Sequence, residues 1–395
     1  MAHSTDNAPT LHVLTLTPFF PSTRNEVSGC FVAEPIEALR QFGVRSSVIA
    51  VSPLHYPSNR PSSIAPAQWV RYPQIPGTFG LSSSGKLLYA RLLEKVRRLN
   101  SANPIAVIHA HAALPCGHAA ALLSAQLKIP FVVTIHGLDV FNSCARLGVM
   151  AARRRAVSVK VYAAAQNIIC VSRKVQEILK TGTPTDTRSA IVHNGVNPCL
   201  FAPNSDAVSP SDPEILVVGT LLASKGQAVV LRAIAALKTS FPGLRCRIIG
   251  EGPDQADFEA LSRDLGLSTG VQFVGRKSRL EVAEAMRRCS IFALPSRNEG
   301  LGCVYLEAMS CGKPVIACRG QGIDDVIEHE KNGWLVPVDG VEQLAQGLAA
   351  LLASAELRAR IGTAARQTIL TKLTLSHQAD QLASIYRHAV SHFAQ

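Results

Sequence analysis

The sequence predicts an α/β protein of two domains, each built on a doubly wound parallel sheet, with the two sheets facing each other. Short apolar runs typical of buried strands alternate with amphipathic helical stretches through both halves of the chain. A chain of 395 residues is too long for one small core. Apolar residues make up 47% of the chain and aromatic residues only 5%, which suits helices rich in Ala, Leu and Val around parallel sheets.

In the first half, the expected strands alternate with loops and helical stretches. The expected strands are 11–16, 44–51, 105–108, 131–135, 167–171 and 190–193. Helices are expected at 31–42, where Gly43 ends the pattern, at 81–99 and after Gly117. The stretch 53–76 contains several prolines and has no clear period, so it is predicted to be irregular.

Ligands of open α/β sheets bind at the carboxyl ends of the strands. The candidates there are His109 and His111 after the strand at 105–108, and His136 and Asp139 after 131–135. A histidine in such a place can also be a packed structural residue. Gly29, in the loop after the first strand, can likewise be part of a ligand-binding turn or an ordinary glycine between a strand and a helix.

The second half starts after a polar, proline-containing stretch at 198–213, which is the expected linker. Its expected strands are 214–218, 244–249, 271–275 and 290–294, and its expected helices start at 227, 304, 344 and 356. The domains are therefore placed at 1–198 and 199–374. A last helix is expected at 375–393, and the family resemblance given below implies that the segment 375–395 crosses back onto the first domain.

The stretch 295–314 combines a strand end, a glycine turn at Gly300 and Gly302, and a helix start. Backbone N–H groups and the helix dipole make such a turn a natural anion site. Glu299 and Glu307 bracket the turn. Phosphate-binding amides flanked by carboxylates suit a sugar nucleotide, although a glutamate like Glu307 could also be a solvated helix residue.

These residues resemble the E-x7-E signature of retaining family 4 glycosyltransferases with the GT-B fold. The matching positions are Ser296, Glu299-Gly300-Leu301-Gly302, Leu306-Glu307-Ala308-Met309, Gly312 and Pro314-Val315. Further matches are Gly29, His109-Ala110-His111, His136-Gly137-Leu138-Asp139, Gly219 with Lys225-Gly226, Gly250-Glu251-Gly252-Pro253 and Val271 to Gly275. The chain departs from the pattern at Ser28, where the family has glycine, and at Thr220, where many members have arginine.

The resemblance implies transfer of a sugar from a nucleoside diphosphate sugar, most commonly a UDP-sugar, to an acceptor on the first domain. Glu299, His136 and Lys225 form the implied catalytic group: Lys225 on the diphosphate, and Glu299 and His136 at the sugar. Glu307 is expected to hold the ribose hydroxyls, because a carboxylate can accept two hydrogen bonds from a diol. The remaining implied donor-site residues are Gly29, Gly219, Gly250, Gly252, Gly275, Arg276, Gly300, Leu301, Gly302 and Cys303. The acceptor-site candidates are His111, Asp139, Ser172 and Arg154.

Neither a metal nor another cofactor is expected, because the chain has no D-x-D motif. The leaving diphosphate would be stabilised by protein cations and backbone amides. Competing readings are a GT-B epimerase or phosphorylase, and a scaffold that binds sugar nucleotide without transfer.

The net positive charge of the chain lies entirely in its first half. Residues 1–200 contain 20 Lys and Arg against 8 Asp and Glu, whereas residues 201–395 contain 20 of each sign. This asymmetry indicates an anionic partner such as a phosphorylated or lipid-linked glycan or a membrane surface, with the helix at 81–99 and Arg153 to Arg155 as candidates. No nucleic-acid-binding motif is present. A small soluble acceptor, or a basic surface that only aids solubility, remains an alternative.

The sequence also predicts a cytoplasmic location, with peripheral contact to the inner face of the membrane as an extension of the charge argument. No apolar run reaches the ~20 residues that span a bilayer. The first ten residues have no basic region typical of a signal peptide. The ten cysteines show no C-x-x-C spacing, which favours free thiols.

Overall fold

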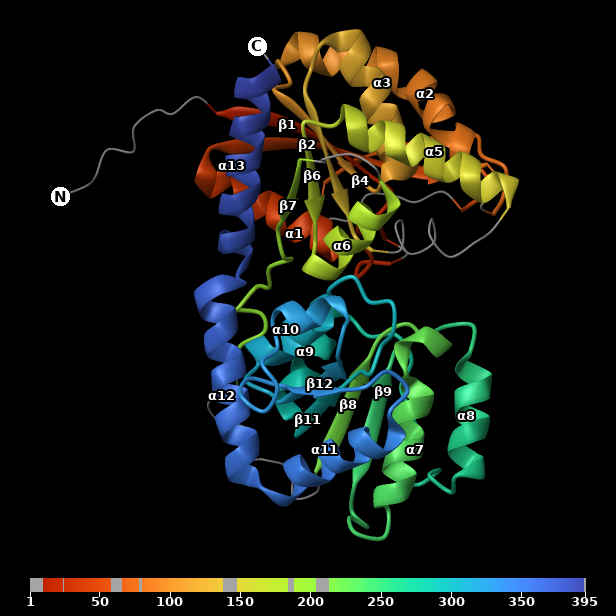
Figure 1. The fold of residues 1–395 in the computed structure, drawn as a ribbon, viewed down its shortest axis with the longest axis vertical. Helices are drawn as coiled ribbons and strands as arrows, with labels where there is room; N and C mark the ends of the chain where they lie inside the picture. The colour runs from red at the N-terminus through yellow and green to blue at the C-terminus, as the bar shows by residue number, and fades with distance from the viewer. Residues whose placement is uncertain are drawn as a thin grey trace, which may run out of the picture. The chain divides into compact units, whose positions relative to one another are not determined.

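The computed structural model describes residues 10–23, 25–57, 66–77, 80–137, 148–183, 188–203 and 213–393. The chain forms two compact units (Figure 1): unit 1 is Met1–His193 with Leu375–Gln395, and unit 2 is Asn194–Thr374. The division therefore falls before the expected boundary at 198/199. The start of the expected linker packs into unit 2, where Phe201 is fully buried and its carbonyl accepts a hydrogen bond from Ser310 Oγ.

Unit 1 contains a parallel sheet whose strands run in the order β3-β2-β1-β4-β5-β6-β7. The strands are β1 Leu11–Thr17, β2 Val44–Pro53, β3 Gln68–Tyr72, β4 Val107–His111, β5 Phe131–Ile135, β6 Asn167–Cys170 and β7 Ser189–Ile191. The central strands are buried along almost their entire length. That burial explains why they appear in the sequence as apolar runs rather than as an alternating pattern.

The helices of unit 1 cover the faces of this sheet. They are α1 Cys30–Leu39, α2 Leu81–Ala102, α3 His118–Leu127, α5 Val149–Ala164, α6 Arg173–Gly182 and α13 Leu375–Phe393. In α2, Leu88, Leu92 and Val96 recur at a four-residue spacing and are fully buried. Each such side chain contributes roughly 1.5–3 kcal/mol by leaving water.

The last helix, α13, belongs to unit 1 although it follows unit 2 in the chain. Ala379, Leu382, Ala383 and Tyr386 are spaced so that they lie on one face of the helix, and they join a core cluster with β1, β4, β5 and β6. α13 also packs along α1. The chain thus leaves unit 1 at residue 193 and returns at residue 375 (Figure 1).

Two of the predictions for unit 1 are corrected. The stretch 53–76 is not irregular throughout, because Gln68–Tyr72 forms the edge strand β3, paired with 49–53 of β2. An edge strand needs a partner on one side only, so flanking prolines do not prevent it. The strand expected at 105–108 runs instead from Val107 to His111, so His109 and His111 lie within it.

Unit 2 contains a second parallel sheet, in the order β10-β9-β8-β11-β12-β13. Its strands are β8 Glu214–Val218, β9 Arg245–Ile249, β10 Val271–Phe273, β11 Ile291–Ala293, β12 Val315–Cys318 and β13 Trp334–Val336. Its helices are α7 Gln227–Leu237, α8 Gln255–Asp264, α9 Arg279–Arg288, α10 Cys303–Ser310, α11 Val341–Ala353 and α12 Ala355–Lys372.

Both units are doubly wound, as predicted. In each sheet the strand order reverses once: between β1 and β4 in unit 1, and between β8 and β11 in unit 2. Ligands of open α/β sheets bind in the crevice at such a switch point, outside the carboxyl ends of the strands. The loops after β1, β4, β8 and β11 are therefore the places where a site is expected.

Candidate active site

In unit 2, the loops after β8 and β11 come into direct contact at the switch point. A short 3-10 turn, Ala223–Lys225, and Gly226 join β8 to α7. A Cβ atom at Gly226 would lie 2.2 Å from the carbonyl oxygen of Pro295, and Gly226 has a φ of +79°. Only glycine satisfies both conditions. The backbone N–H of Arg297 donates to Ser224 O at 2.8 Å, which holds the two loops together.

This contact brings Lys225 to Glu299. Lys225 Nζ lies 2.6 Å from Glu299 Oε2, and the two side chains are 28% and 14% exposed. Ser296 Oγ lies 3.2 Å from the same carboxylate oxygen. The backbone of Glu299 is held from the other side, because its N–H donates to Gln321 Oε1 at 3.2 Å and its carbonyl accepts from Gly322 N at 3.1 Å.

Glu307 lies on α10 and is buried, with 4% of its surface exposed. The alternative of a solvated helix residue is therefore wrong. Its Oε1 is bonded to Nη1 of Arg279, the first residue of α9. The Arg279 guanidinium also lies over the Phe201 ring, 4.9 Å from the ring centroid. A buried carboxylate requires such a partner, because an uncompensated charge in the interior is costly.

The predicted glycine positions meet at the neighbouring strand ends. Gly219 follows β8, Gly250 and Gly252 follow β9, and Gly275 follows β10. A Cβ atom at Gly250 would lie 1.9 Å from Gly219 O, and Gly250 N donates to Gly275 O at 2.9 Å. The close packing of three strand ends therefore explains Gly250 without a ligand. Beside it, Arg276 Nη2 lies 3.1 Å from Glu251 Oε2, and both side chains are about half exposed.

The other predicted donor residues of unit 2 lie in the loop and first turn that carry Glu299. Gly302 caps the N-terminus of α10, and Cys303 is its first residue. Leu301 is 2% exposed, so its side chain belongs to the core and only its backbone can meet a ligand. Gly300 packs against Gly322, where a Cβ atom would lie 1.7 Å from the Gly300 carbonyl oxygen.

In unit 1, the corresponding edge of the sheet holds three histidines in contact. His111 Nδ1 and His136 Nε2 are 2.9 Å apart, and their rings are stacked. His109 Nε2 bonds Thr134 Oγ1 at 2.7 Å, and its Nδ1 bonds the Tyr386 hydroxyl of α13 at 2.7 Å.

Burial keeps these histidines neutral. It lowers the pKa of His136 to about 3, and burial together with His136 lowers the pKa of His109 to about 3. Burial, followed by the neighbouring histidines, also holds the pKa of His111 well below its usual value. In the bond between two neutral imidazoles, one ring must donate and the other accept. The tautomers of His111 and His136 are therefore coupled through this bond.

Gly29 lies close to this histidine group. It caps α1 and packs against the backbone of Phe19 and Phe20. The Phe19 ring in turn meets the His136 ring edge-on, with 5.8 Å between the centroids. Phe19 therefore links Gly29 to His136, and His136 is in turn bonded to His111.

The remaining acceptor-site candidates have other surroundings. Ser172 is fully buried, and its hydroxyl accepts from Val175 N at 3.3 Å as the N-cap of α6. Arg154 is 7% exposed, whereas Arg153 and Arg155 are exposed, so the three arginines do not form one basic surface. The Arg155 guanidinium donates to Gly182 O at 3.1 Å. Asp139 lies outside the described residues.

Sequence reasoning missed Arg279, Gln321 and Tyr386. Arg279 had a usable signal, because Ser278 and Glu281 form a capping box that marks the start of α9 and places Arg279 in its first turn. Nothing near Gln321 or Tyr386 in the sequence points to the residues that they contact 22 and 277 positions away.

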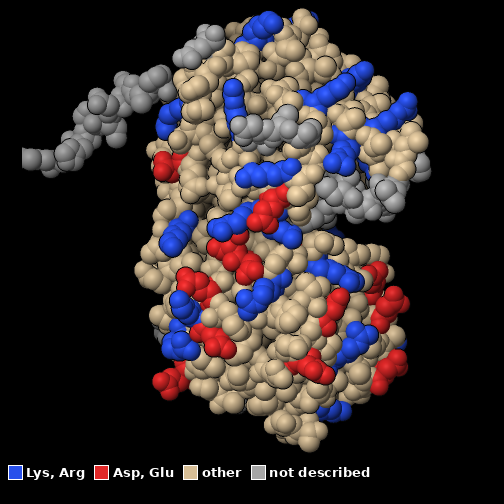
Figure 2. Space-filling model, viewed as in Figure 1, with Lys and Arg blue, Asp and Glu red and all other residues tan. Residues whose placement is uncertain are grey.

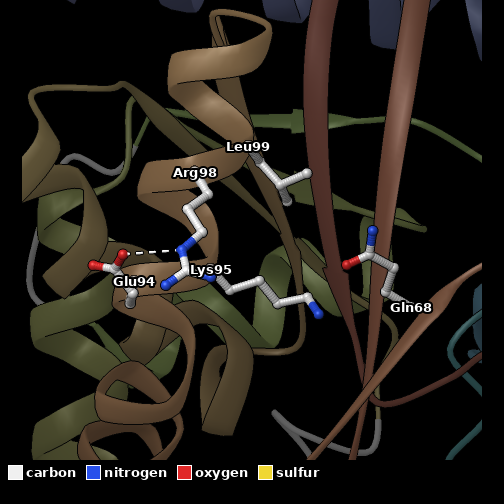
Figure 3. Close-up of a pocket in the computed structure, with 5 residues that line it drawn as sticks. All are labelled: Gln68, Glu94, Lys95, Arg98 and Leu99. Atoms are coloured by element: carbon white, nitrogen blue, oxygen red, sulfur yellow. Dashed lines mark hydrogen bonds and ion pairs between the residues drawn. The ribbon is translucent and has the colours of Figure 1, made fainter.

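A basic surface lies on α2. Its apolar side is buried in the core of unit 1, which leaves Lys86, Arg91, Arg97 and Arg98 exposed. On the face drawn in Figure 2, Lys and Arg gather over α2 and α5 with few acidic residues. A cavity of about 470 Å³ lies between α2 and the start of β3. Figure 3 shows Lys95 reaching across it toward Gln68, while Arg98 turns back to Glu94, with 3.1 Å between the paired atoms.

Within the described ranges, no group of three or more His, Cys, Asp or Glu residues is arranged to hold a metal ion. Among those same residues, none of the helices has both the length and the apolar character needed to cross a bilayer.

Comparison with known proteins gives a family-model match in each half of the chain. The family model for Glycosyltransferase Family 4 matches residues 31–199, and the model for Glycosyl transferases group 1 matches residues 202–368. An uncharacterized glycosyltransferase of Methanocaldococcus jannaschii is 32% identical over 65% of this chain and 68% of its own length. A D-inositol 3-phosphate glycosyltransferase of Saccharomonospora viridis is 29% identical over 73% of this chain and 71% of its own length. TuaC of Bacillus subtilis, a glycosyltransferase ascribed to teichuronic acid biosynthesis, is 25% identical over 83% of this chain and 86% of its own length.

Solved structures share the fold of the entire chain. Sucrose-phosphate synthase from Thermosynechococcus elongatus has a TM-score of 0.78 at 20% identity, covering 97% of this chain and 99% of its own. Anabaena HepE, in complex with UDP and glucose, has a TM-score of 0.75 at 19% identity, covering 95% of this chain and 98% of its own. The chain therefore belongs to the family 4 glycosyltransferases, the glycosyl transferases group 1, and has their GT-B fold.

Proposed function

We propose that this glycosyltransferase moves a hexosyl or N-acetylhexosaminyl group, with retention of configuration, from a nucleoside diphosphate sugar to a lipid-linked or cell-envelope glycan. The observation that carries the proposal is the Lys225–Glu299 pair at the switch point of unit 2, beside the N-terminus of α10. A cation, a carboxylate and a helix N-terminus at one strand edge suit a ligand with both a diphosphate and sugar hydroxyls.

In the proposed reaction, Lys225 moves from Glu299 to the diphosphate when the donor binds. Its charge and the amides of 300–303 then stabilise the oxygen of the departing nucleoside diphosphate. Glu299, released from Lys225, accepts hydrogen bonds from the transferred sugar. Glu307 accepts bonds from the ribose hydroxyls, and Arg279 pairs with that carboxylate and holds it in position.

The donor is proposed to be a UDP-sugar. The support is the HepE structure, which was determined with UDP and with UDP-glucose. We further propose that Gly219, Gly250, Gly252, Gly275 and Arg276 border the nucleotide, since they occupy the neighbouring strand ends. His136 would contact the sugar as a neutral imidazole, in a tautomer coupled to that of His111.

The acceptor proposal rests on the charge of unit 1 and on the names of relatives such as TuaC. A second candidate is a small soluble phosphorylated acceptor, which the relatives named D-inositol 3-phosphate glycosyltransferase favour. The enzyme is proposed to act in the cytoplasm, in peripheral contact with the inner face of the membrane. No step is proposed to need a metal, because the chain has no D-x-D motif.

Incubation with radiolabelled UDP-sugars tests the function. The membrane fraction of a Gram-negative or Gram-positive bacterium and a panel of soluble sugar phosphates serve as acceptors. Transfer of label to a lipid-extractable or polymeric product supports the primary proposal, and transfer to a soluble product supports the second candidate. Label that stays on an isomerised donor would indicate an epimerase. Activity lost in EDTA and restored by Mg²⁺ or Mn²⁺ would contradict the metal-free reaction.

A further inference from the structure

A cavity in unit 1 lies at the carboxyl ends of four neighbouring strands. It has a volume of about 490 Å³. Pro18 and Phe19 follow β1, Pro53 ends β2, Tyr72 ends β3, and Leu114 comes shortly after β4. These strands are adjacent in the order β3-β2-β1-β4. The cavity, which we call the carboxyl-edge pocket, therefore occupies the part of the sheet where α/β proteins bind ligands.

The pocket adjoins the histidine group. Phe19 forms part of its wall, and the same ring meets His136 edge-on at a centroid distance of 5.8 Å. Phe19 thus links the pocket to the imidazole that is proposed to act at the transferred sugar. A molecule held in the pocket would therefore lie near His136, and an acceptor hydroxyl must be held close to the sugar that it attacks.

The lining of the pocket determines the chemistry of that molecule. Its described lining residues include no Asp, Glu, Lys or Arg. Phe19, Tyr56 and Tyr72 supply aromatic surface, and prolines and aliphatic side chains make up most of the remainder. A charged group would lose its hydration here without gaining a counter-charge, whereas an apolar group would be buried favourably.

The few polar groups of the pocket can form hydrogen bonds with hydroxyls of a ligand. Ser52 lines the pocket and is 6% exposed, and its hydroxyl has no hydrogen-bond partner in the structure. Buried hydroxyls are normally paired, so this one has an unused capacity to bond a ligand. At the same edge, the Tyr72 hydroxyl donates to Gln74 Oε1 at 2.7 Å. An apolar cavity with a few polar groups is the usual form of a small-molecule site.

We propose that the carboxyl-edge pocket binds the acceptor through an uncharged, hydrocarbon-rich aglycone joined to the sugar that is glycosylated. The proposal rests on the proposed glycosyl transfer and refines it. Any phosphate of the acceptor would lie outside this pocket, and the basic residues of α2 would serve the surrounding anionic surface rather than the reacting sugar.

The test measures how binding depends on the length of the aglycone. Methyl, butyl, hexyl and octyl β-D-glucosides, kept below their micelle concentrations, are titrated calorimetrically into the full chain without donor. Affinity should rise about fourfold for each methylene that the pocket buries. Octyl phosphate at high salt should bind at least tenfold more weakly than octyl glucoside. Equal affinity across the glucosides, or tighter binding of octyl phosphate, would overturn the proposal.

Two matched variants locate the effect. Tyr56 and Leu54 are both exposed, at 57% and 48%, and are close in the chain, but only Tyr56 lines the pocket. Tyr56→Asp should reduce the gain per methylene to less than twofold, whereas Leu54→Asp should leave it unchanged. The same loss in both variants would place the binding elsewhere.

The same glucosides, assayed with labelled UDP-sugars, separate this proposal from the proposed function. Binding that depends on chain length, without transfer from any donor, would contradict the function and leave the pocket assignment intact. Transfer whose kcat/KM is independent of chain length would support the function and refute the pocket assignment.

Discussion

Lys225 is the residue whose removal should affect the reaction most directly. Its ammonium lies 2.6 Å from Glu299 and is partly exposed, so it can exchange that partner for a diphosphate. We expect Lys225→Ala to lower kcat by roughly 10²–10³-fold, the loss seen when one group that stabilises a developing anion is removed. The KM for the donor should change less. Lys238→Ala is the control, because Lys238 Nζ bonds the backbone carbonyl of Gly266 rather than Glu299. Kinetics equal to the control would rule out the assigned role.

Glu307 and Arg279 should behave as a unit in donor binding and in stability. Glu307→Gln keeps the shape of the side chain but removes the charge that faces Arg279. We expect the free energy of unfolding to fall by about 2 kcal/mol, because a largely buried hydrogen bond between charged groups is lost. The thermal stabilisation by UDP-sugar should also decrease. If Glu307→Gln matches the wild type in both measurements, Glu307 has neither role.

The neutral histidines of unit 1 make its stability depend on pH. The folded-state pKa of His109 is about 3, and the unfolded value is about 6.5. Below pH 6.5, His109 is therefore protonated in the unfolded chain but stays neutral in the folded unit. The contribution of His109 to the free energy of unfolding is fully present above that pH. It decreases by about 1.4 kcal/mol per pH unit as the pH falls toward 3.

Urea unfolding between pH 7 and pH 5 measures this dependence. His109→Gln should flatten the decrease, whereas the exposed His388→Gln should not. A slope that His109→Gln leaves unchanged would show that other groups set the pH dependence.

Individual residues also show where sequence reasoning ends. The positions of Lys225 and Glu299 at strand ends follow from local patterns, but their ion pair joins residues 74 apart through a loop contact that no pattern describes. Arg154 looks like part of a charged run, yet it is buried because it lies on the inner side of α5. Ser52 lies inside an apolar strand, and only the fold reveals that its hydroxyl has no partner and borders a cavity.

At the scale of elements, parallel strands and their helices were predictable because each has its own hydrophobic period. The edge strand β3 was not, since five residues between prolines carry little periodic information. The extension of β4 over His109 and His111 was missed for a related reason. Polar side chains usually mark a strand end, but these two are buried by Thr134, Tyr386 and His136 from other elements.

The helix α13 should stabilise unit 1 and not unit 2, because its apolar face is buried in the cluster with β1, β4, β5 and β6. Leu382 is 5% exposed, so Leu382→Ala should cost about 2–5 kcal/mol of unit 1 stability. Ser384→Ala, on the exposed side of the same helix, should stay within about 0.5 kcal/mol of the wild type.

The chain's two tryptophans separate the units in this experiment. Trp69 lies in unit 1 and Trp334 in unit 2, so a Trp334→Phe background reports unit 1 by fluorescence and a Trp69→Phe background reports unit 2. Leu382→Ala should shift the urea midpoint in the first background only. A shift confined to the second background would mean that α13 stabilises unit 2 instead.

At the scale of the entire molecule, the charge is divided between the units as the sequence indicates. Unit 1 carries 21 Lys and Arg against 9 Asp and Glu, and unit 2 carries 19 of each sign. The structure adds that Leu88, Leu92 and Val96 of α2 are buried in unit 1, so most of the apolar side of this helix is not available to a bilayer. We therefore expect membrane contact through α2 to be mainly electrostatic.

That restriction gives a prediction for vesicle binding. We expect the protein to sediment with vesicles that contain phosphatidylglycerol at low salt and to be released at high salt, because charges are screened beyond ~8 Å at physiological ionic strength. Each basic residue near an anionic surface contributes about 1 kcal/mol, so Lys95→Glu with Arg98→Glu should weaken binding by at least about thirtyfold. Lys238→Glu with Arg263→Glu changes the charge equally on exposed residues of unit 2 and should have much less effect. Equal losses in both variants would mean that net charge alone drives attachment. No binding at low salt would leave the basic surface without a role at the membrane.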